Sequence, residues 1–274
     1  MFNIALICTC FNRVKITRKS LNSITKVLKN TKKINKFHFF ILDDNSKDQT
    51  NKFLTNFKNT SVLKSKGNLY WARGMRVCFS YFYNDIIKYD ILIPFNDDII
   101  LKKNNLNHLI DKYELLLKKK KLFLLSVPCK FNNKIIYGGQ KFKYNSFLPI
   151  FKIVKPFKNK LLKIDVINMN FALIPMSIIS KYKFLDNYFK HALADFAFSL
   201  KLRKFRIYSY LYSKSIIECR PNLRQSNKLE KIDLKPKEKF YKNYFMIYYY
   251  LWPVRTFIKK YFYESNKITK KQIV

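Results

Sequence analysis

Glycines and acidic residues are scarce in this chain of 274 residues. It has four glycines, none of them before Gly67, and 17 Asp and Glu against 55 Lys and Arg. The loops GxxxxGK[ST] and GxGxxG, whose backbone N–H groups cradle phosphates after a first strand, are absent. A bound diphosphate would therefore need another partner, and each acidic residue becomes informative by its position.

Cysteines are few and odd in number. All five lie in or beside apolar runs, and Cys8 and Cys10 are separated by a single residue (Cys8, Cys10, Cys78, Cys129 and Cys219). No second Cys/His pair completes a zinc site. We expect buried, reduced thiols and hence a cytoplasmic protein.

Long hydrophobic runs are missing as well. The longest uncharged run, residues 166–180, has 15 residues, whereas a helix that spans a bilayer needs about 20. The N-terminal sequence MFNIALICTCF lacks the basic segment and the cleavage site of a signal peptide. We expect a first strand there and no membrane-spanning helix.

The formal net charge is +38. Such a charge is typical of nucleic-acid binders, but Lys, Asn, Ile, Phe and Tyr are abundant together, as codon bias in an AT-rich genome produces. We assign most of the lysine to that bias and expect no nucleic-acid partner. The surface should still attract anionic lipid headgroups and phosphorylated ligands.

Hydrophobic runs alternate with helical patterns through the first half. Strands are expected at 3–11, 38–42, 61–63, 90–95 and 122–129, and helices at 21–29, 46–57, 67–84 and 104–120, the second opened by a Ser46–Gln49 capping box. This alternation predicts an α/β fold with a mostly parallel central sheet flanked by helices. In such sheets ligands bind beyond the carboxyl ends of the strands.

The second half is less regular. A strand is expected at 165–174 and a helix at 191–204, and Gly138-Gly139 indicates a tight turn. Residues 226–274 form a basic and aromatic C-terminal extension with twelve Lys and Arg against four acids from Lys228 onward. This extension is either a helix packed on the domain or a peripheral contact with an anionic membrane.

Three polar corners follow predicted strands: Asn12-Arg13, Asp43-Asp44 and Asn96-Asp97-Asp98. Since strand ends share one edge of a parallel sheet, these corners should converge on one site. Asp98 could hold Mg²⁺ or Mn²⁺, because one or two carboxylates plus ligand phosphates suffice for such cations. Asp43 could accept a hydrogen bond from a base, and Arg13 could stack on the base or contact phosphate.

A carboxylate that can accept a proton follows in the second half. Asp195 lies in the predicted helix 191–204 among apolar residues, and it could take a proton from an attacking hydroxyl. His191, four residues earlier on the same face, either orients that acid and touches substrate or packs as an ordinary histidine.

Taken together, TCFNR (9–13), LDDNSKDQT (42–50), NDD (96–98) and HALADFAFSLKLRK (191–204) resemble the inverting glycosyltransferases of family 2, with their GT-A fold. The segment GNLYWARGM (67–75) resembles the version of the donor-side helix in rhamnosyltransferase-like members. The resemblance covers roughly residues 3–205. It implies a domain at 1–225, with a nucleotide-binding half at 1–100 and an acceptor and catalytic half at 101–225.

The resemblance also implies roles for single residues. Asp195 would be the catalytic base and Asp98 the last carboxylate of a DxD-type metal motif. The remaining assignments are nucleotide-binding residues (Thr9, Phe11, Asn12, Arg13, Asp43, Asn68 and Gly74) and donor or acceptor contacts (Trp71, Asp97 and His191). Three positions depart from the family pattern: Asn96 replaces the first metal-motif acid, Ala194 replaces the acid before the base, and Ala197 replaces an acid often found two residues after it.

We therefore expect a hexosyl or deoxyhexosyl transferase that uses a UDP- or dTDP-linked donor and a glycan or lipid-linked glycan acceptor. By family analogy, its product would belong to a bacterial surface polysaccharide or lipooligosaccharide. The alternatives are a nucleotidyltransferase, a nucleic-acid binder that uses the basic surface, and an inactive sugar-binding relative.

Overall fold

The computed structural model describes residues 1–102, 105–120, 122–143, 150–156, 159–187, 189 and 193–219. They belong to one compact unit, Met1–Lys143 with Ile150–Asn222. The second unit, which includes the predicted C-terminal extension 226–274, lies outside the described residues, as does His191.

The first half alternates strands and helices as expected. Its elements are β1 (Phe2–Cys10), α1 (Val14–Lys29), β2 (Ile34–Asp43), α2 (Thr50–Thr55), β3 (Thr60–Lys64), α3 (Tyr70–Phe82), the 3₁₀ helix η1 (Tyr83–Lys88) and β4 (Ile91–Pro94). Each of the four strands predicted before residue 96 is present, with bounds that differ by a few residues.

The second half contains more and shorter strands. Its elements are β5 (Ile99–Ile100), α4 (Asn105–Lys120), β6 (Phe123–Ser126), β7 (Cys129–Phe131), β8 (Lys134–Tyr137), β9 (Gly139–Lys143), β10 (Ile150–Ile153), β11 (Leu161–Ile164), β12 (Val166–Ile167), β13 (Ala172–Pro175), α5 (Met176–Tyr182), α6 (Ala194–Arg203), β14 (Tyr208–Tyr212) and β15 (Ile217–Cys219). The single strands predicted at 122–129 and 165–174 are each broken in two, the second by a turn at residues 168–170.

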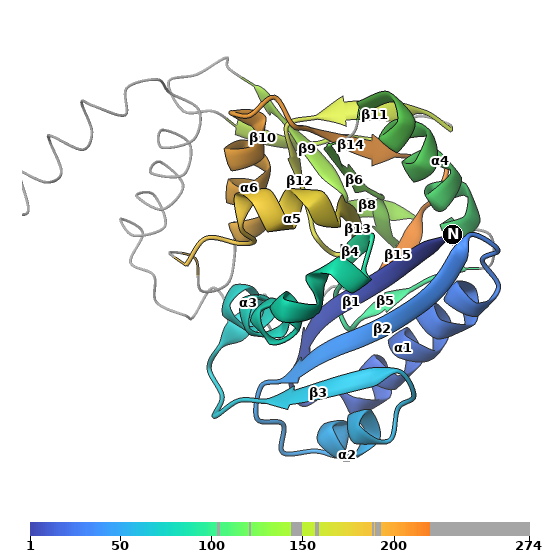
Figure 1. Cartoon of the computed structure of the whole chain (residues 1–274). Coiled ribbons are helices and arrows are strands. Elements are labelled where there is room, and N and C mark those ends of the chain that lie inside the picture. The colour runs from blue at the N-terminus through green and yellow to red at the C-terminus, as the bar shows by residue number, and fades with distance from the viewer. Residues whose placement is uncertain are drawn as a thin grey trace, which may run out of the picture. The chain divides into compact units, whose positions relative to one another are not determined.

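An eight-stranded sheet with the order β11-β14-β6-β13-β4-β1-β2-β3 forms the centre of the unit (Figure 1). β1 pairs in parallel with β2 and β4, whereas β13 runs antiparallel to both of its neighbours. A second sheet has the order β5-β15-β7-β8. The expected α/β class is confirmed, with a mixed sheet in which the nucleotide-side strands are parallel.

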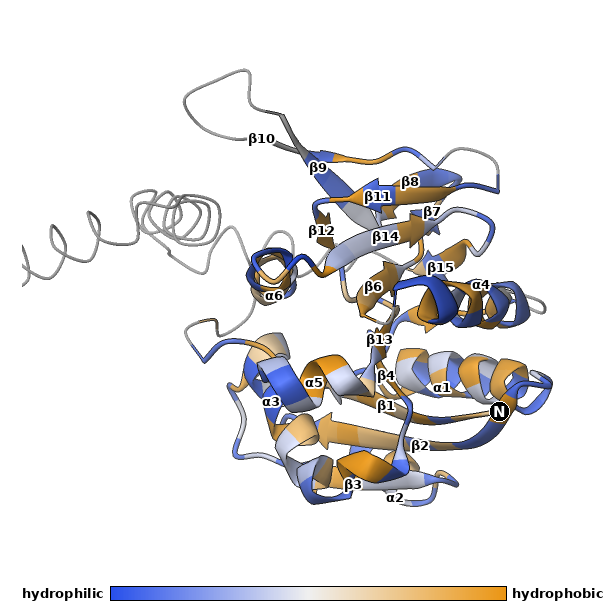
Figure 2. Cartoon of the chain, turned by 45° about the horizontal axis from the view of Figure 1, so that its top comes forward, coloured by the Kyte–Doolittle hydropathy of each residue, from blue (hydrophilic) through white to orange (hydrophobic). Residues whose placement is uncertain are grey.

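Helices cover both faces of β1 and β2. Leu21 and Ile24 of α1 share a buried cluster with Ile4 and Leu6 of β1, whereas α3 packs on the opposite face. Figure 2 shows the central strands β4, β6 and β13 coloured as hydrophobic, while α1 and α4 alternate between polar and apolar residues. This pattern is expected for strands buried on two faces and helices buried on one.

The predicted capping box at Ser46 and Gln49 is wrong. α2 begins only at Thr50, whose backbone N–H donates to Asp48 Oδ1 at 2.9 Å. The Ser46 hydroxyl instead accepts from the backbone N–H of Asn12 at 2.9 Å. Ser46 therefore joins two strand corners rather than opening a helix.

All five cysteines are buried and unpaired, as expected from the sequence. Within the described ranges, no helix is long and apolar enough to cross a membrane.

Gly74 allows α3 to lie close to the sheet. A Cβ at this position would overlap Thr9 Cγ2 and lie 2.8 Å from Leu42 Cδ2. We predict that Gly74→Ala lowers the free energy of unfolding by about 1–2 kcal/mol, because overpacking exceeds the gain in helix propensity. Urea denaturation measures this loss, and Ser80→Ala on the exposed side of α3 is the control. Equal stability of the two variants would contradict the packing role.

Candidate functional site

The first two polar corners are joined by hydrogen bonds. Asn12, in a left-handed conformation with φ +50°, accepts at Oδ1 from the backbone N–H of Lys47 at 2.6 Å. Asp43 accepts at Oδ1 from the N–H of Ser46 at 3.0 Å. Asp44 N–H donates to the carbonyl of Cys10 at 3.0 Å. The ends of β1 and β2 thus form one polar ledge at the carboxyl edge of the sheet.

Arg13 joins this ledge to the third corner. Its guanidinium forms an ion pair with Asp97 at 2.6 Å and lies 3.6 Å from Asp98. The Thr17 hydroxyl donates to Asp97 Oδ2 at 3.0 Å. The three corners therefore meet, as the strand order required.

Asp97 is occupied by these partners. Its side chain is 1% exposed, and burial raises its pKa despite the nearby charge of Arg13 and the bond from Thr17. The expected donor or acceptor contact would require a carboxylate that a substrate can reach. Asp97 is better suited to hold Arg13 in place.

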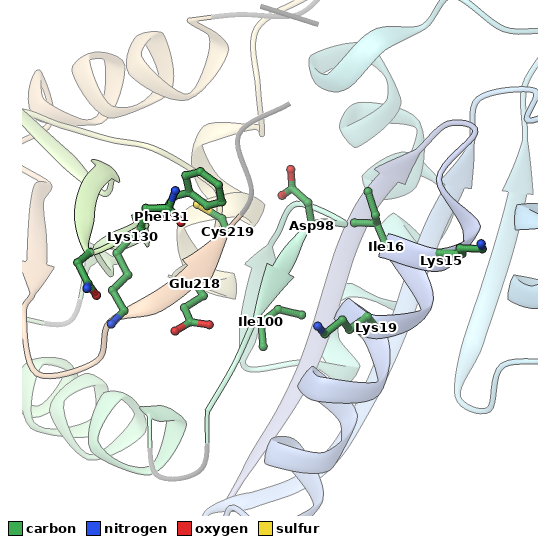
Figure 3. Close-up of a pocket in the computed structure, with 11 residues that line it drawn as sticks. Lys15, Ile16, Lys19, Asp98, Ile100, Lys130, Phe131, Glu218 and Cys219 are labelled. Atoms are coloured by element: carbon green, nitrogen blue, oxygen red, sulfur yellow. The ribbon is translucent and has the colours of Figure 1, made fainter. Parts of the chain in front are cut away.

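Asp98 has the features of a metal ligand. Its Oδ1 atom is buried and has no hydrogen-bond partner in the described part of the chain, and its carboxylate lines a cavity (Figure 3). Burial, followed by the neighbouring charge of Asp97, raises its pKa to about 6. A buried carboxylate oxygen without a partner is uncommon, and a hard cation such as Mg²⁺ or Mn²⁺ would satisfy it.

The other groups near Asp98 limit the kind of metal site. Among the described residues, no three His, Cys, Asp or Glu side chains cluster as metal ligands. Asn96 Oδ1 accepts a hydrogen bond from Trp71 Nε1 at 3.1 Å. A cation at Asp98 would therefore take its remaining ligands from substrate phosphates or water, as Mg²⁺ commonly does.

Asp44 has a role that the sequence did not reveal. Its carboxylate accepts from the backbone N–H groups of Leu69 and Tyr70 at 3.1 and 3.2 Å and from the Ser65 hydroxyl at 2.5 Å. It satisfies N–H groups at the start of α3 and complements the helix dipole there. A separation of 25 residues leaves no local signal for such a cap.

The other expected nucleotide-binding residues differ in access. Phe11 is 47% exposed, and Asn68 is exposed, in a left-handed conformation with φ +63° just before α3. Gly74 lies in α3 and is buried where this helix packs against Thr9. For Gly74 the structure indicates a packing role, and direct contact with a nucleotide would require α3 to move away.

Asp195 lies in the first turn of α6. Its carboxylate accepts from the backbone N–H of Met169 at 3.3 Å and of Phe196 at 3.0 Å. Burial raises its pKa to about 6, against the opposing effect of these hydrogen bonds. This is a suitable environment for a general base, since its pKa lies closer to neutrality than that of an exposed aspartate.

The turn at residues 168–170 connects Asp195 to the Asp98 corner. The Asn170 carbonyl accepts from the N–H of Asn96 at 3.0 Å, and Phe171 forms a bridge with Phe95. Met169, the residue before Asn170, donates its backbone N–H to the Asp195 carboxylate. Two asparagines within the uncharged run 166–180 were the available signal for this turn.

Comparison with known proteins gives the family of this chain. The profile described as "Glycosyl transferase family 2" matches residues 5–182. The chain belongs to glycosyl transferase family 2. Among curated proteins, none matches the sequence significantly.

Solved structures show the same GT-A fold. A crystal structure of S. aureus TarS residues 1–349 in complex with UDP-GlcNAc matches with a TM-score of 0.59 and 13% identity, over 88% of this chain and 64% of that one. A structure of GalNAc-T7 with UDP, GalNAc and Mn²⁺ matches with a TM-score of 0.56 and 12% identity, over 80% of this chain and 43% of that one. This family 2 chain thus spans less than two thirds of either relative.

The Arg13–Asp97 pair generates a stability prediction. Arg13→Met leaves the buried carboxylate of Asp97 and the partly buried one of Asp98 without their cation, so we expect the free energy of unfolding to fall by about 3–5 kcal/mol. Lys26→Met, on the exposed side of α1, is the control and should change stability by less than about 0.5 kcal/mol. Urea denaturation at pH 7.5 measures both. Equal effects of the two substitutions would show that the pair does not stabilise the fold.

Proposed function

We propose that this chain is an inverting glycosyltransferase that moves a sugar from a nucleoside-diphosphate donor to a hydroxyl of a glycan acceptor. The observation that carries the proposal is the turn at 168–170, which is hydrogen-bonded both to the Asn96–Asp98 corner and to Asp195. The turn thereby binds the Asp195 carboxylate directly and joins it to the backbone of the corner that carries Asp98.

The donor would lie across the carboxyl ends of β1 and β2. Asp43 would accept from the base, while Asn12 and the exposed Phe11 and Asn68 would border the nucleoside. Arg13, oriented by Asp97, would place positive charge near the diphosphate. The remaining exposure of Arg13, 22%, is consistent with such a contact.

Asp195 would act as the base. Its carboxylate would take the proton of the acceptor hydroxyl while that oxygen attacks the anomeric carbon, and the bond from that carbon to the diphosphate would break. Attack on the face opposite the leaving group inverts the anomeric centre. The N–H groups of Met169 and Phe196 fix the orientation of the carboxylate.

A divalent cation held by Asp98 would offset the negative charge that develops on the leaving diphosphate. The unpartnered Oδ1 of Asp98 supports this assignment. Asn96 has an amide where a second carboxylate would bind the metal, and the oxygen of that amide already accepts a hydrogen bond from Trp71. We therefore expect a metal that binds weakly without nucleotide and tightly with it.

The donor would be linked to UDP or dTDP. UDP-GlcNAc is bound to the TarS fragment, and UDP with Mn²⁺ to GalNAc-T7. The donated sugar would be a hexosyl or deoxyhexosyl group, rhamnosyl included, because the segment GNLYWARGM at the start of α3 resembles the donor-side helix of rhamnosyltransferase-like members. The product would belong to a bacterial surface polysaccharide or lipooligosaccharide made in the cytoplasm, with residues 226–274 as a peripheral membrane contact.

Two other functions were open from the sequence. A nucleotidyltransferase would need a glycine-rich basic loop after β1, where the chain has TCFNRVK. A nucleic-acid binder has no use for a partly buried Asp98 or for Asp195 in the first turn of α6. The transferase uses both carboxylates.

Separate roles for Asp98 and Asp195 can be tested by calorimetric titration with UDP and dTDP, with and without Mn²⁺. We expect Asp98→Asn to remove the Mn²⁺-dependent part of nucleotide binding. Asp195→Asn should bind nucleotide as the wild type does and lose turnover by 10²-fold or more. Equal loss of nucleotide affinity in both variants would contradict these roles.

The raised pKa of Asp195 predicts a pH dependence. Because the base must be deprotonated, kcat/KM should fall tenfold per pH unit below about pH 6. The profile is measured at saturating Mn²⁺, since Asp98 otherwise titrates in the same range. A rate that stays constant down to pH 5 would exclude Asp195 as the base.

A further inference from the structure

A cavity of about 520 Å³ adjoins Asp98 on the side of the second sheet. Figure 3 shows Lys15, Ile16 and Lys19 of α1 on one side and residues of β7, β15 and the β7–β8 turn on the other, with Asp98 and Ile100 between them. The volume is within the range of about 300–1,000 Å³ typical of small-molecule sites.

The charged groups of this cavity are three lysines and the two acids Asp98 and Glu218. Lys15, Lys19 and Lys130 line it, and within the described ranges none of their ammonium groups lies in ion-pair distance of a carboxylate. Glu218, the other acid of the lining, is paired with Lys102 at 2.7 Å. Lys19 and Lys130 therefore remain available for a ligand, whereas the Lys15 side chain in Figure 3 points away from the opposite wall.

Lysines on opposite walls of the cavity both act electrostatically on the Glu218 carboxylate. The pKa of Glu218 is lowered first by its hydrogen bond from Lys102, and then by the charges of Lys102, Lys130 and Lys19. Lys19 comes from α1 and Lys130 from β7. A phosphate between Lys19 and Lys130 would thus be attracted from both walls, while the negative charges of Glu218 and Asp98 would be offset by Lys102 and by the proposed cation.

The remaining lining suits a sugar-sized group. Ile16, Ile100 and Phe131 form apolar walls, and the hairpin turn presents Asn132 and Asn133, both with positive φ. Apolar walls with a few placed polar groups are typical of ligand sites. Lysine is a common point-charge partner of phosphate.

We propose that this cavity binds a phosphate group of the acceptor, so that the glycan receiving the sugar is a phosphorylated one. The inference rests on the proposed transferase function. Among the described residues assigned to the site, only Asp98 also lines the cavity. Asn12 and Asp43, which would border the nucleoside, do not line it. Asp195 does not line it either, so the lining separates the cavity from the nucleoside, and UDP affinity distinguishes an acceptor phosphate from the donor diphosphate.

The test compares Lys19→Gln/Lys130→Gln with the charge-matched control Lys52→Gln/Lys58→Gln, whose lysines are exposed on and just after α2. Glucose 6-phosphate and glucose are titrated into each full-length protein in the presence of Mn²⁺ and UDP. We expect glucose 6-phosphate to bind the wild type and the control alike and the cavity variant about tenfold more weakly. Glucose should not distinguish the three proteins.

Two further measurements test whether the phosphate is carried by a lipid and whether the cavity binds the donor diphosphate instead. Vesicles of phosphatidylglycerol replace the sugar phosphate to test a lipid-borne phosphate. Loss of binding by the cavity variant in either arm supports the proposal, and loss in neither overturns it. UDP affinity should stay within twofold of the wild type; a parallel loss would assign the cavity to the donor diphosphate and also overturn the proposal. Failure of the wild type to bind either UDP or dTDP would instead refute the transferase function.

Discussion

The buried ion pair between Arg13 and Asp97 is the interaction on which the site depends. It joins the end of β1 to the segment after β4, at 2.6 Å and with Asp97 only 1% exposed. Removing a carboxylate from water is costly, and here one guanidinium and one hydroxyl offset that cost. The arrangement leaves Asp98, the next residue, with a buried oxygen that has no partner in the described chain. One acid supports the fold, and its neighbour remains available for chemistry.

From this corner a short series of backbone bonds leads to Asp195. The backbone N–H of Asn96 donates to the Asn170 carbonyl, and the backbone N–H of Met169 donates to the Asp195 carboxylate. β13 begins just after this turn and runs antiparallel between β4 and β6, so the turn lies at the same edge as the parallel strand ends. The mixed sheet therefore explains how a residue from α6 enters a site formed by the first half of the chain.

The sequence predicted the strand corners because adjacent acids and asparagines at the ends of apolar runs are a local signal. It also pointed to Asp195, from the apolar neighbours of that residue and from the family resemblance, and the role of Asp195 as the base stays a prediction. It could not predict the Asp44 cap on α3 or the Trp71–Asn96 bond, since both join residues 25 positions apart. The packing role of Gly74 was missed for the same reason, because it depends on Thr9 and Leu42 of other elements. Local patterns predicted which residues are polar at the edge, and only the fold showed which partners they have.

The central claim is that the Asp98 corner and Asp195 form one catalytic site. It is tested most directly by release of nucleoside diphosphate from UDP- and dTDP-sugars in the presence of Mn²⁺, because slow transfer of the donor sugar to water needs no acceptor. The account predicts release from at least one donor by the wild type, and none above background by Asp98→Asn or by Asp195→Asn. Release that persists in Asp195→Asn, or its absence with every donor, would contradict the claim.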